Sequence, residues 1–231
     1  MQVIILAAGQ SHRFKEAGYR IPKPFLEIEW RGLVAPMLEH VRYTIPLEFK
    51  GVTVATLIGG SPISSEVNII GIENTKGPAD TVRQVIEKIE PQSCLIMDSD
   101  ILNFTNDLRG ITNLPDSYIG VLVCRSNNPA FSYVDSIELF NVIKEKNRIS
   151  EYAVRGAYFV GKDVMGEFTF ALDAATTGQQ EPFVSHAFDL MGCKKMAIET
   201  TYVPVDWGTP HDVELSGARI VTERRKEDVR D

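Results

Sequence analysis

The feature that most constrains this chain is a short apolar run at its start that opens directly into a turn of small residues. The run spans residues 3–7, and Ala8 and Gly9 follow it. An apolar segment of this length that ends at glycine is typical of a strand covered on both faces of a parallel sheet. Small residues leave the backbone N–H groups of the turn open to a ligand, and such groups can hold phosphate oxygens.

Two basic residues follow the turn. Arg13 offers a forked guanidinium, and Lys23 offers a compact ammonium. Near a phosphate-binding turn, the pair would offset the charge of a leaving pyrophosphate. Pro22 and Pro24 flank Lys23 and keep its backbone extended. A solvated basic pair in a loop is the competing interpretation at this point.

Strand-like and helix-like segments alternate through the first half of the chain. We expect strands at residues 3–7, 52–57, 68–72, 94–97 and 119–124, and helices at 36–41 and from 78 to the proline at 91. This alternation predicts an α/β fold, one three-layer α/β/α domain around a mixed, mainly parallel sheet of the Rossmann-like kind. Ligands of such sheets lie beyond the carboxyl ends of the strands.

The second half of the chain gives weaker patterns. Residues 137–143 alternate loosely, and we expect them to form a strand that pairs with residues 155–160. A helix is expected at 182–191 and a late strand at 196–205. The domain is placed at residues 1–221, and a charged tail is placed at 222–231, as a solvated helix end or a disordered segment.

Composition limits the classes of function. The 231 residues carry a formal net charge of −7, which argues against broad binding of nucleic acid or of anionic membranes. No apolar run approaches the roughly 18 residues of a membrane span, and no signal peptide precedes the first strand. Cys94, Cys124 and Cys193 lack metal-site spacing and lie in or near apolar segments. We expect free thiols in a cytoplasmic protein.

Longer motifs resemble a known family. Residues 6–14, Leu-Ala-Ala-Gly-x-Ser-x-Arg-Phe, and residues 22–26, Pro-Lys-Pro-Phe-Leu, look like the signature of the nucleotidylyltransferases that make nucleotide sugars. The short members related to glucose-1-phosphate thymidylyltransferases are the most similar in kind. Ser11 stands where many members have glycine. The resemblance implies the nucleotide-diphospho-sugar transferase fold.

The resemblance also implies site residues. The catalytic pair would be Arg13 and Lys23, and the motif at 75–81 would hold base and ribose. Nucleotide binding is thus expected at Leu6, Ala7, Ala8, Gly9, Gly77 and Asp80. Asp80 is not the residue expected there, and a first-turn acid favoured by the helix dipole is its alternative role.

Two further motifs complete the expected site. The strand that ends in Asp98-Ser99-Asp100 and the late segment at 205–210 resemble the elements that bind Mg²⁺ in this family, through Asp100 and Asp206. A loop acid and a helix cap are the plain alternatives for these two aspartates. By resemblance, Glu145 would hold sugar hydroxyls, Lys146 the sugar phosphate, and Gly156 would admit the sugar. A charged hairpin turn is the alternative for residues 144–148.

The resemblance implies an enzyme. It would join a nucleoside triphosphate to a sugar 1-phosphate, with Mg²⁺, and release pyrophosphate. Two other functions stay open: a glycosyltransferase that uses Asp98-Ser99-Asp100 as a metal motif, and a catalytically silent nucleotide-sugar sensor. The base, the sugar or choline-like phosphate, and assembly into a homo-oligomer also stay open.

Overall fold

A computed structural model describes residues 1–49, 51–57, 67–178 and 181–223. Its helices are α1 His12–Glu16, α2 Met37–Arg42, α3 Pro78–Ile89, α4 Thr105–Thr112, α5 Met165–Gly178, α6 Val184–Leu190 and α7 Pro210–Leu215. Its strands are β1 Gln2–Ala7, β2 Glu27–Trp30, β3 Leu33–Pro36, β4 Val52–Leu57, β5 Asn68–Ile72, β6 Cys94–Asp98, β7 Ile101–Leu102, β8 Tyr118–Arg125, β9 Tyr133–Val134, β10 Glu138–Leu139, β11 Ile143–Lys144, β12 Tyr152–Val160, β13 Lys194–Glu199, β14 Val205–Asp206 and β15 Arg219–Ile220.

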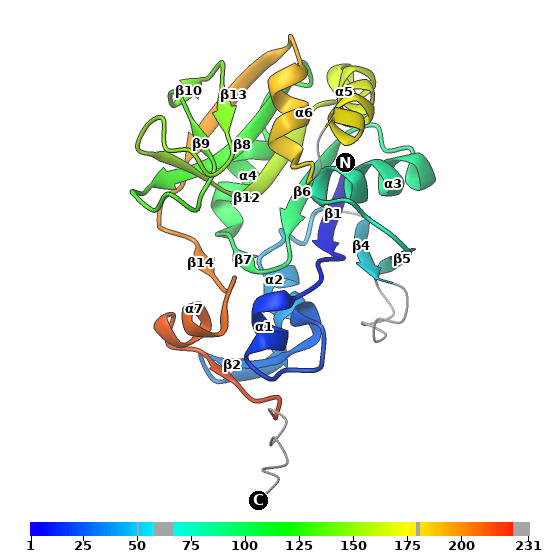
Figure 1. Cartoon of the computed structure of the whole chain (residues 1–231). Coiled ribbons are helices and arrows are strands. Elements are labelled where there is room, and N and C mark those ends of the chain that lie inside the picture. Colours follow the sequence, from blue (N-terminus) through cyan, green and yellow to red (C-terminus); the bar gives the residue numbers. More distant parts are fainter. Residues whose placement is uncertain (50, 58–66, 179–180, 224–231) are drawn as a thin grey trace, which may run out of the picture.

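A large central sheet runs through the molecule in the order β10-β13-β8-β12-β6-β1-β4-β5. Figure 1 shows β1 and β4 on one side of β6, and β12 and β8 on the other. The pairs β6–β1, β1–β4, β4–β5 and β8–β13 are parallel, whereas β12 is antiparallel to both of its long neighbours, β6 and β8. The prediction of a mixed, mainly parallel sheet in a single domain is confirmed.

Alternating side chains of the central strands point into two separate cores. Ile4 and Ile96 pack on one face with α3, α5 and α6, whereas Val3, Ile5 and Leu95 pack on the other face with α1, α2, α4 and α7. Both faces of β1 are therefore covered, as its continuous apolar run predicts. The predicted three layers, α/β/α, follow from this arrangement.

A small three-stranded sheet, β15-β2-β3, lies beside α1 and α7 at the lower end of the molecule in Figure 1. Glu27 joins this sheet to the last described residues, because its backbone N–H donates to Thr222 Oγ1 at 2.9 Å and its C=O accepts from the Val221 N–H at 2.8 Å. Most of the predicted charged tail, residues 224–231, lies outside the described residues, so the boundary at 221 stays a prediction.

The expected strand at residues 137–143 is wrong. Only two short strands form there: β10 pairs with β13, and β11 pairs with β9, so neither pairs with β12. Glu138 takes a left-handed backbone conformation (φ 64°), which breaks an extended run. The Asp135 carboxylate also accepts the backbone N–H groups of Asn141 and Val142 and closes this segment into a loop.

The expected single strand at 196–205 is also wrong, because the chain leaves the sheet after β13 and forms β14 separately. Helices α4 and α5 were not predicted. In α5 the buried residues Phe168 and Leu172 are accompanied by an exposed Phe170, so its apolar periodicity is weak. The other expected elements in the described residues form within one to three residues of their predicted bounds.

The three cysteines are free thiols, as expected. Cys94 and Cys124 are buried in the sheet, and Cys193 is partly exposed. Burial raises the pKa of Cys94 to about 12, which suppresses its reactive thiolate form. Within the described residues no helix combines the length and the apolar character that a membrane crossing requires.

Candidate active site

The parallel register of β1 and β6 brings the opening turn beside the first carboxylate motif. Leu6 lies opposite Asp98, so the turn after β1 and the segment after β6 leave the sheet at the same edge. Ser11 precedes α1 in a left-handed conformation (φ 57°), which explains why glycine suits this position in similar chains. Its Oγ accepts the backbone N–H of Lys23 at 2.8 Å and fixes the second loop against the first.

A cavity of about 470 Å³ opens at this edge of the sheet, and we call it the central cavity. Five segments line it: the end of β1 with its turn, the loop at Lys23, the start of α3, the end of β6 with the residues after it, and Glu181 before α6. Of the predicted site residues, the structure brings the following six into its lining: Leu6, Ala8, Gly9, Lys23, Gly77 and Asp100.

The other predicted nucleotide residues face elsewhere. Ala7 packs into the core on the α1 side of the sheet. Asp80 lies in the first turn of α3, where its carboxylate accepts the Lys76 backbone N–H at 3.0 Å and pairs with Arg83 at 2.9 Å. Asp80 therefore supports the loop that forms one wall of the central cavity, and a nucleotide contact of its own stays a prediction.

Gly77 allows two backbones to meet at the start of α3. A Cβ at this position would lie 2.8 Å from the carbonyl oxygen of Pro182, which also accepts the Ala79 N–H at 2.9 Å. By contrast, a Cβ at Gly9 would have no described protein atom within 4 Å. Packing thus explains the glycine at 77 and leaves the glycine at 9 without a structural reason.

Asp100 and Asp206 come together through a second strand pair. Strands β7 and β14 are antiparallel with Ile101 opposite Asp206, and the Trp207 backbone N–H donates to the Asp100 carbonyl at 2.8 Å. Thr209, and not Asp206, caps helix α7, since its hydroxyl accepts the Asp212 N–H. Asp206 is therefore not the N-cap of α7, although it accepts the Gly208 N–H in the turn that leads to this helix, as the alternative interpretation expects.

Each of these two aspartates is paired with a basic side chain. Lys23 Nζ lies 2.5 Å from Asp100 Oδ2, and Arg155 Nη2 lies 3.1 Å from Asp206 Oδ2. The other oxygen of Asp206 accepts the Gly208 N–H at 2.8 Å. Burial and the nearby Asp100 carboxylate raise the pKa of Asp206, whereas Arg155 opposes that rise.

Asp98 is the most strongly perturbed carboxyl of the site. Burial raises its pKa to about 7, the negative charges of Asp100, Glu145 and Asp206 act in the same direction, and Lys23 opposes them. A carboxyl group with this pKa is partly protonated at neutral pH. Four carboxyl groups therefore lie close enough to act on one another, an arrangement that is common where a cation binds.

Glu145 is held by two serine hydroxyls. Ser132 donates to Oε2 at 2.5 Å, and Ser185 donates to Oε1. Lys146 is exposed, with a left-handed backbone (φ 49°), and its Nζ lies 5.1 Å from the centre of the Phe183 ring. Glu145 and Lys146, two of the three expected sugar-phosphate residues, thus lie by the start of α6, and the charge of Glu145 acts on Asp98.

Arg13 projects from α1 toward the turn that follows Asp206. Its Nη1 would lie 3.8 Å from a Cβ at Gly208, and Asp206 Oδ1 would lie 3.0 Å from the same point. Arg13 is exposed and does not line the central cavity. Arg13 and Lys23 therefore approach the aspartate pair from different sides.

The donor chemistry at Asp100 and Asp206 fits Mg²⁺. This ion binds through one or two carboxylates and completes its shell with water and substrate phosphates. Among the described residues no group of three or more His, Cys, Asp or Glu side chains is placed to hold a metal ion by itself. Asp100, between β6 and β7, lines the central cavity, and Asp206 on β14 is brought next to that segment by the pairing of β14 with β7. Two such carboxylates match a cation that is shared with a substrate.

Two charged residues of the candidate site, Asp98 and Arg155, were not identified as site residues from the sequence. Asp98 stands two positions before Asp100, and that spacing is a signal, although we used it only for the glycosyltransferase alternative. Arg155 stands in the middle of an otherwise apolar strand, where a charged residue needs a partner when buried. Nothing in the sequence marks the two serines that hold Glu145.

Several solved structures share this fold, although no family model and no curated protein sequence matches the chain. A nucleoside-diphosphate-sugar pyrophosphorylase from Vibrio cholerae aligns over 92% of this chain and 98% of its own, at 17% identity and a TM-score of 0.71. A UDP-glucose pyrophosphorylase from Acinetobacter aligns over 93% of this chain and 91% of its own, at 12% identity and a TM-score of 0.72.

A third structure, from Bacillus anthracis and named for a glucose-1-phosphate thymidylyltransferase, covers 94% of this chain and 93% of its own, at 16% identity and a TM-score of 0.74. All three names fall in the class of proteins that the sequence motifs resemble. The fold expected from that resemblance is therefore confirmed.

Gly156 lies too close to Asp98 for a side chain, and its replacement by alanine tests this contact. It has a left-handed backbone (φ 55°), and a Cβ there would lie 2.7 Å from Asp98 Oδ2 and 2.7 Å from Ile101 Cδ1. Gly156→Ala should lower the free energy of unfolding by about 1–2 kcal/mol through backbone strain and by roughly 1–3 kcal/mol more through crowding of Asp98. Urea unfolding measures the loss.

Gly217 is the matched control. It is also left-handed (φ 76°), but a Cβ there would meet no described atom within 4 Å. Gly217→Ala should therefore lower the free energy of unfolding only by the backbone strain, about 1–2 kcal/mol. Equal losses in the two variants would contradict the close contact between Gly156 and Asp98.

Proposed function

We propose that this chain is a sugar-phosphate nucleotidyltransferase, which joins a nucleoside triphosphate to a sugar 1-phosphate and releases pyrophosphate. One observation supports this most: a single cavity is lined by a small-residue turn, by Lys23 and by Asp100. A triphosphate needs open backbone donors, a cation and a metal ligand at one place. The shared fold adds support, since a UTP-bound UGPase from Acinetobacter baumannii has it, at 12% identity and a TM-score of 0.73.

The triphosphate would lie between the turn at Gly9 and the ammonium of Lys23. Leu6 and Ala8 line the central cavity together with Gly77 and Pro78. Base and ribose would then rest against the start of α3. The open space at Gly9 supports this placement, because no protein packing requires a glycine there.

The sugar phosphate would enter from the side of Glu145 and Lys146. The two serine hydroxyls orient the Glu145 carboxylate, whose remaining lone pairs can accept sugar hydroxyls. Lys146 would bring its ammonium to the sugar phosphate, whereas the space that a side chain at Gly156 would take is filled by Asp98 and Ile101 and not left open for the sugar. The choice of base and sugar rests on residues around these two subsites.

The reaction would be an in-line displacement at the α-phosphorus. An oxygen of the sugar phosphate forms the new P–O bond, the bond to the bridging α,β-oxygen breaks, and pyrophosphate leaves with both electrons. Mg²⁺ held by Asp100 and Asp206 would neutralise negative charge on the phosphate oxygens. Arg13 and Lys23 would stabilise the departing charge, and no general base is needed because the attacking phosphate is already anionic.

Two substitutions test the catalytic roles. Asp100→Asn and Arg13→Ala should each lower turnover by about 10²-fold or more, because each removes a preorganised contact to charge that develops in the transition state. Pyrophosphate release measures turnover, with each of ATP, CTP, GTP, UTP and dTTP against a panel of sugar 1-phosphates and phosphocholine.

The matched controls are Asp163→Asn and Arg125→Ala, which change exposed residues outside the candidate site. Both should keep near-normal turnover. Near-normal pyrophosphate release in Asp100→Asn and Arg13→Ala would contradict the roles assigned to these residues. Sugar transfer from a nucleotide sugar, without pyrophosphate release, would favour the glycosyltransferase instead, and tight nucleotide binding without any turnover would favour the sensor.

Gly9 gives an independent test of the triphosphate subsite. Gly9→Ala should leave the melting temperature within about 2 °C of the wild type, because the added methyl meets no described atom. It should weaken binding of the accepted nucleoside triphosphate by about tenfold or more, since the methyl would stand between phosphate and backbone. Isothermal titration calorimetry measures the affinity.

Gly110→Ala is the control, since a Cβ in helix α4 at that position also meets nothing within 4 Å. This variant should bind the nucleotide as the wild type does. Unchanged affinity in Gly9→Ala would argue that the triphosphate lies elsewhere.

A further inference from the structure

Both candidate metal ligands carry a counter-ion that the chain itself supplies. Lys23 pairs with Asp100 at 2.5 Å, and Arg155 pairs with Asp206 at 3.1 Å. Each cation thus occupies one carboxylate oxygen of the pair expected to bind Mg²⁺. Lys23 and Arg155 thus supply the positive charge that directly contacts the two aspartates.

The two ion pairs differ in their access to solvent. The Lys23 side chain is 20% exposed and lines the central cavity, so its ammonium can move from Asp100 to an incoming phosphate. The Arg155 side chain is only 3% exposed and comes from the middle of β12. The first pair is exchangeable, whereas the second is fixed by the sheet.

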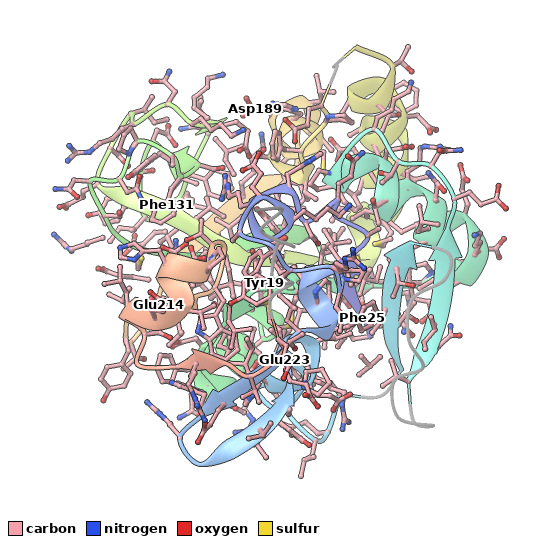
Figure 2. All side chains as sticks on the ribbon, turned by 60° about the horizontal axis from the view of Figure 1, so that its bottom comes forward. Tyr19, Phe25, Phe131, Asp189, Glu214 and Glu223 are labelled. Atoms are coloured by element: carbon pink, nitrogen blue, oxygen red, sulfur yellow. The ribbon has the colours of Figure 1, made fainter. Side chains whose placement is uncertain are left out.

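Phe131 covers the guanidinium of Arg155, with Cζ 4.3 Å from the centre of the ring. Figure 2 labels Phe131, which belongs to the segment between β8 and β9. The Nε of Arg155 is buried and has no hydrogen-bond partner among the described residues. Asp206 is therefore the carboxylate that compensates this buried charge, and breaking the pair would leave that charge alone.

A fixed cation beside a metal ligand has an electrostatic consequence. It attracts the carboxylate and repels an approaching divalent cation, and partial burial makes both effects stronger than in water. A triphosphate changes the balance, because it brings about four negative charges and a competing partner for Lys23. Because Lys23 would then pair with the phosphates, the Asp100 carboxylate would be free to bind a cation that arrives with the triphosphate.

We propose that Lys23 and Arg155 are built-in counter-ions that close the Asp100–Asp206 pair to free divalent cations and admit a cation only together with a triphosphate. Lys23 is the exchangeable member, and Arg155 is the fixed member, because it is buried in β12 beneath Phe131 with its guanidinium at Asp206. This inference rests on the proposed function, since it takes Asp100 and Asp206 as metal ligands.

Binding of Mn²⁺ to the full chain, without nucleotide, tests the proposal. Electron paramagnetic resonance counts free Mn²⁺ and reports affinity independently of turnover. The wild type should bind Mn²⁺ weakly, and Arg155→Met and Lys23→Met should each bind it about tenfold more tightly or better, because each removes a repelling charge. The charge-preserving variants Arg155→Lys and Lys23→Arg should bind Mn²⁺ within about threefold of the wild type.

Arg125→Met is the control, because it removes an exposed arginine that pairs with Glu151 and Glu199, away from the site. Its Mn²⁺ affinity should equal that of the wild type. Affinity in Arg155→Met that is unchanged or weaker would overturn the role of Arg155. If circular dichroism shows that this variant does not fold, Lys23→Met decides the proposal in the same way.

A second titration separates this inference from the proposed function. With each of ATP, CTP, GTP, UTP and dTTP in turn, the wild type should bind Mn²⁺ tightly with at least one of them. No nucleotide-dependent Mn²⁺ binding and no pyrophosphate release would contradict the proposed function itself. Pyrophosphate release by the wild type, together with unchanged Mn²⁺ affinity in both methionine variants, would overturn only the counter-ion proposal.

Discussion

The parallel pairing of β1 with β6 is the constraint on which the rest of the site depends. With Leu6 opposite Asp98, the turn at Ala8 and Gly9 and the carboxylates after β6 leave the sheet side by side. Both strands are buried on two faces, so a shift of register by one residue would move apolar side chains between the two cores. Core packing therefore fixes the distance between the phosphate-binding turn and the aspartates.

Charge crowding is the second physical feature of the site. Burial raises the pKa of Asp98 and of Asp206, and the neighbouring carboxylates raise both pKa values further. Such crowding costs stability and is common where charged substrates or metals bind. The chain offsets part of it with Lys23 and Arg155, one at the open side of the site and one inside the sheet.

Much of the fold follows from local patterns. The apolar run of β1, the proline and glycine at the start of α3, and the buried strand β6 are each readable from a few adjacent residues, and each forms as predicted. The segment around Glu138 could not be predicted in this way, because hydrogen bonds that the Asp135 carboxylate accepts from the Asn141 and Val142 N–H groups decide its path. The role of Arg155 could not be predicted for the same reason, because its partner, Asp206, lies 51 residues away in the chain.

The same division applies to the candidate site. The motifs around Gly9, Lys23, Gly77, Asp100 and Asp206 identify residues that the structure brings to one edge of the sheet. The partners of other site side chains could not be predicted. Asp80 forms an ion pair with Arg83, and Glu145 accepts hydrogen bonds from two serines in distant segments. The resemblance gives roles to single residues, whereas the counter-ions emerge only from the packed structure.

A crystal structure with a non-hydrolysable analogue of the accepted nucleoside triphosphate and Mg²⁺ would test the central claim most directly. The account predicts the triphosphate in the central cavity, against the backbone of Gly9, with Lys23 moved from Asp100 to the phosphates and Arg155 still on Asp206. Binding of the nucleotide in the neighbouring hollow lined by Trp30, Pro204 and Leu215, with Lys23 still on Asp100, would contradict it.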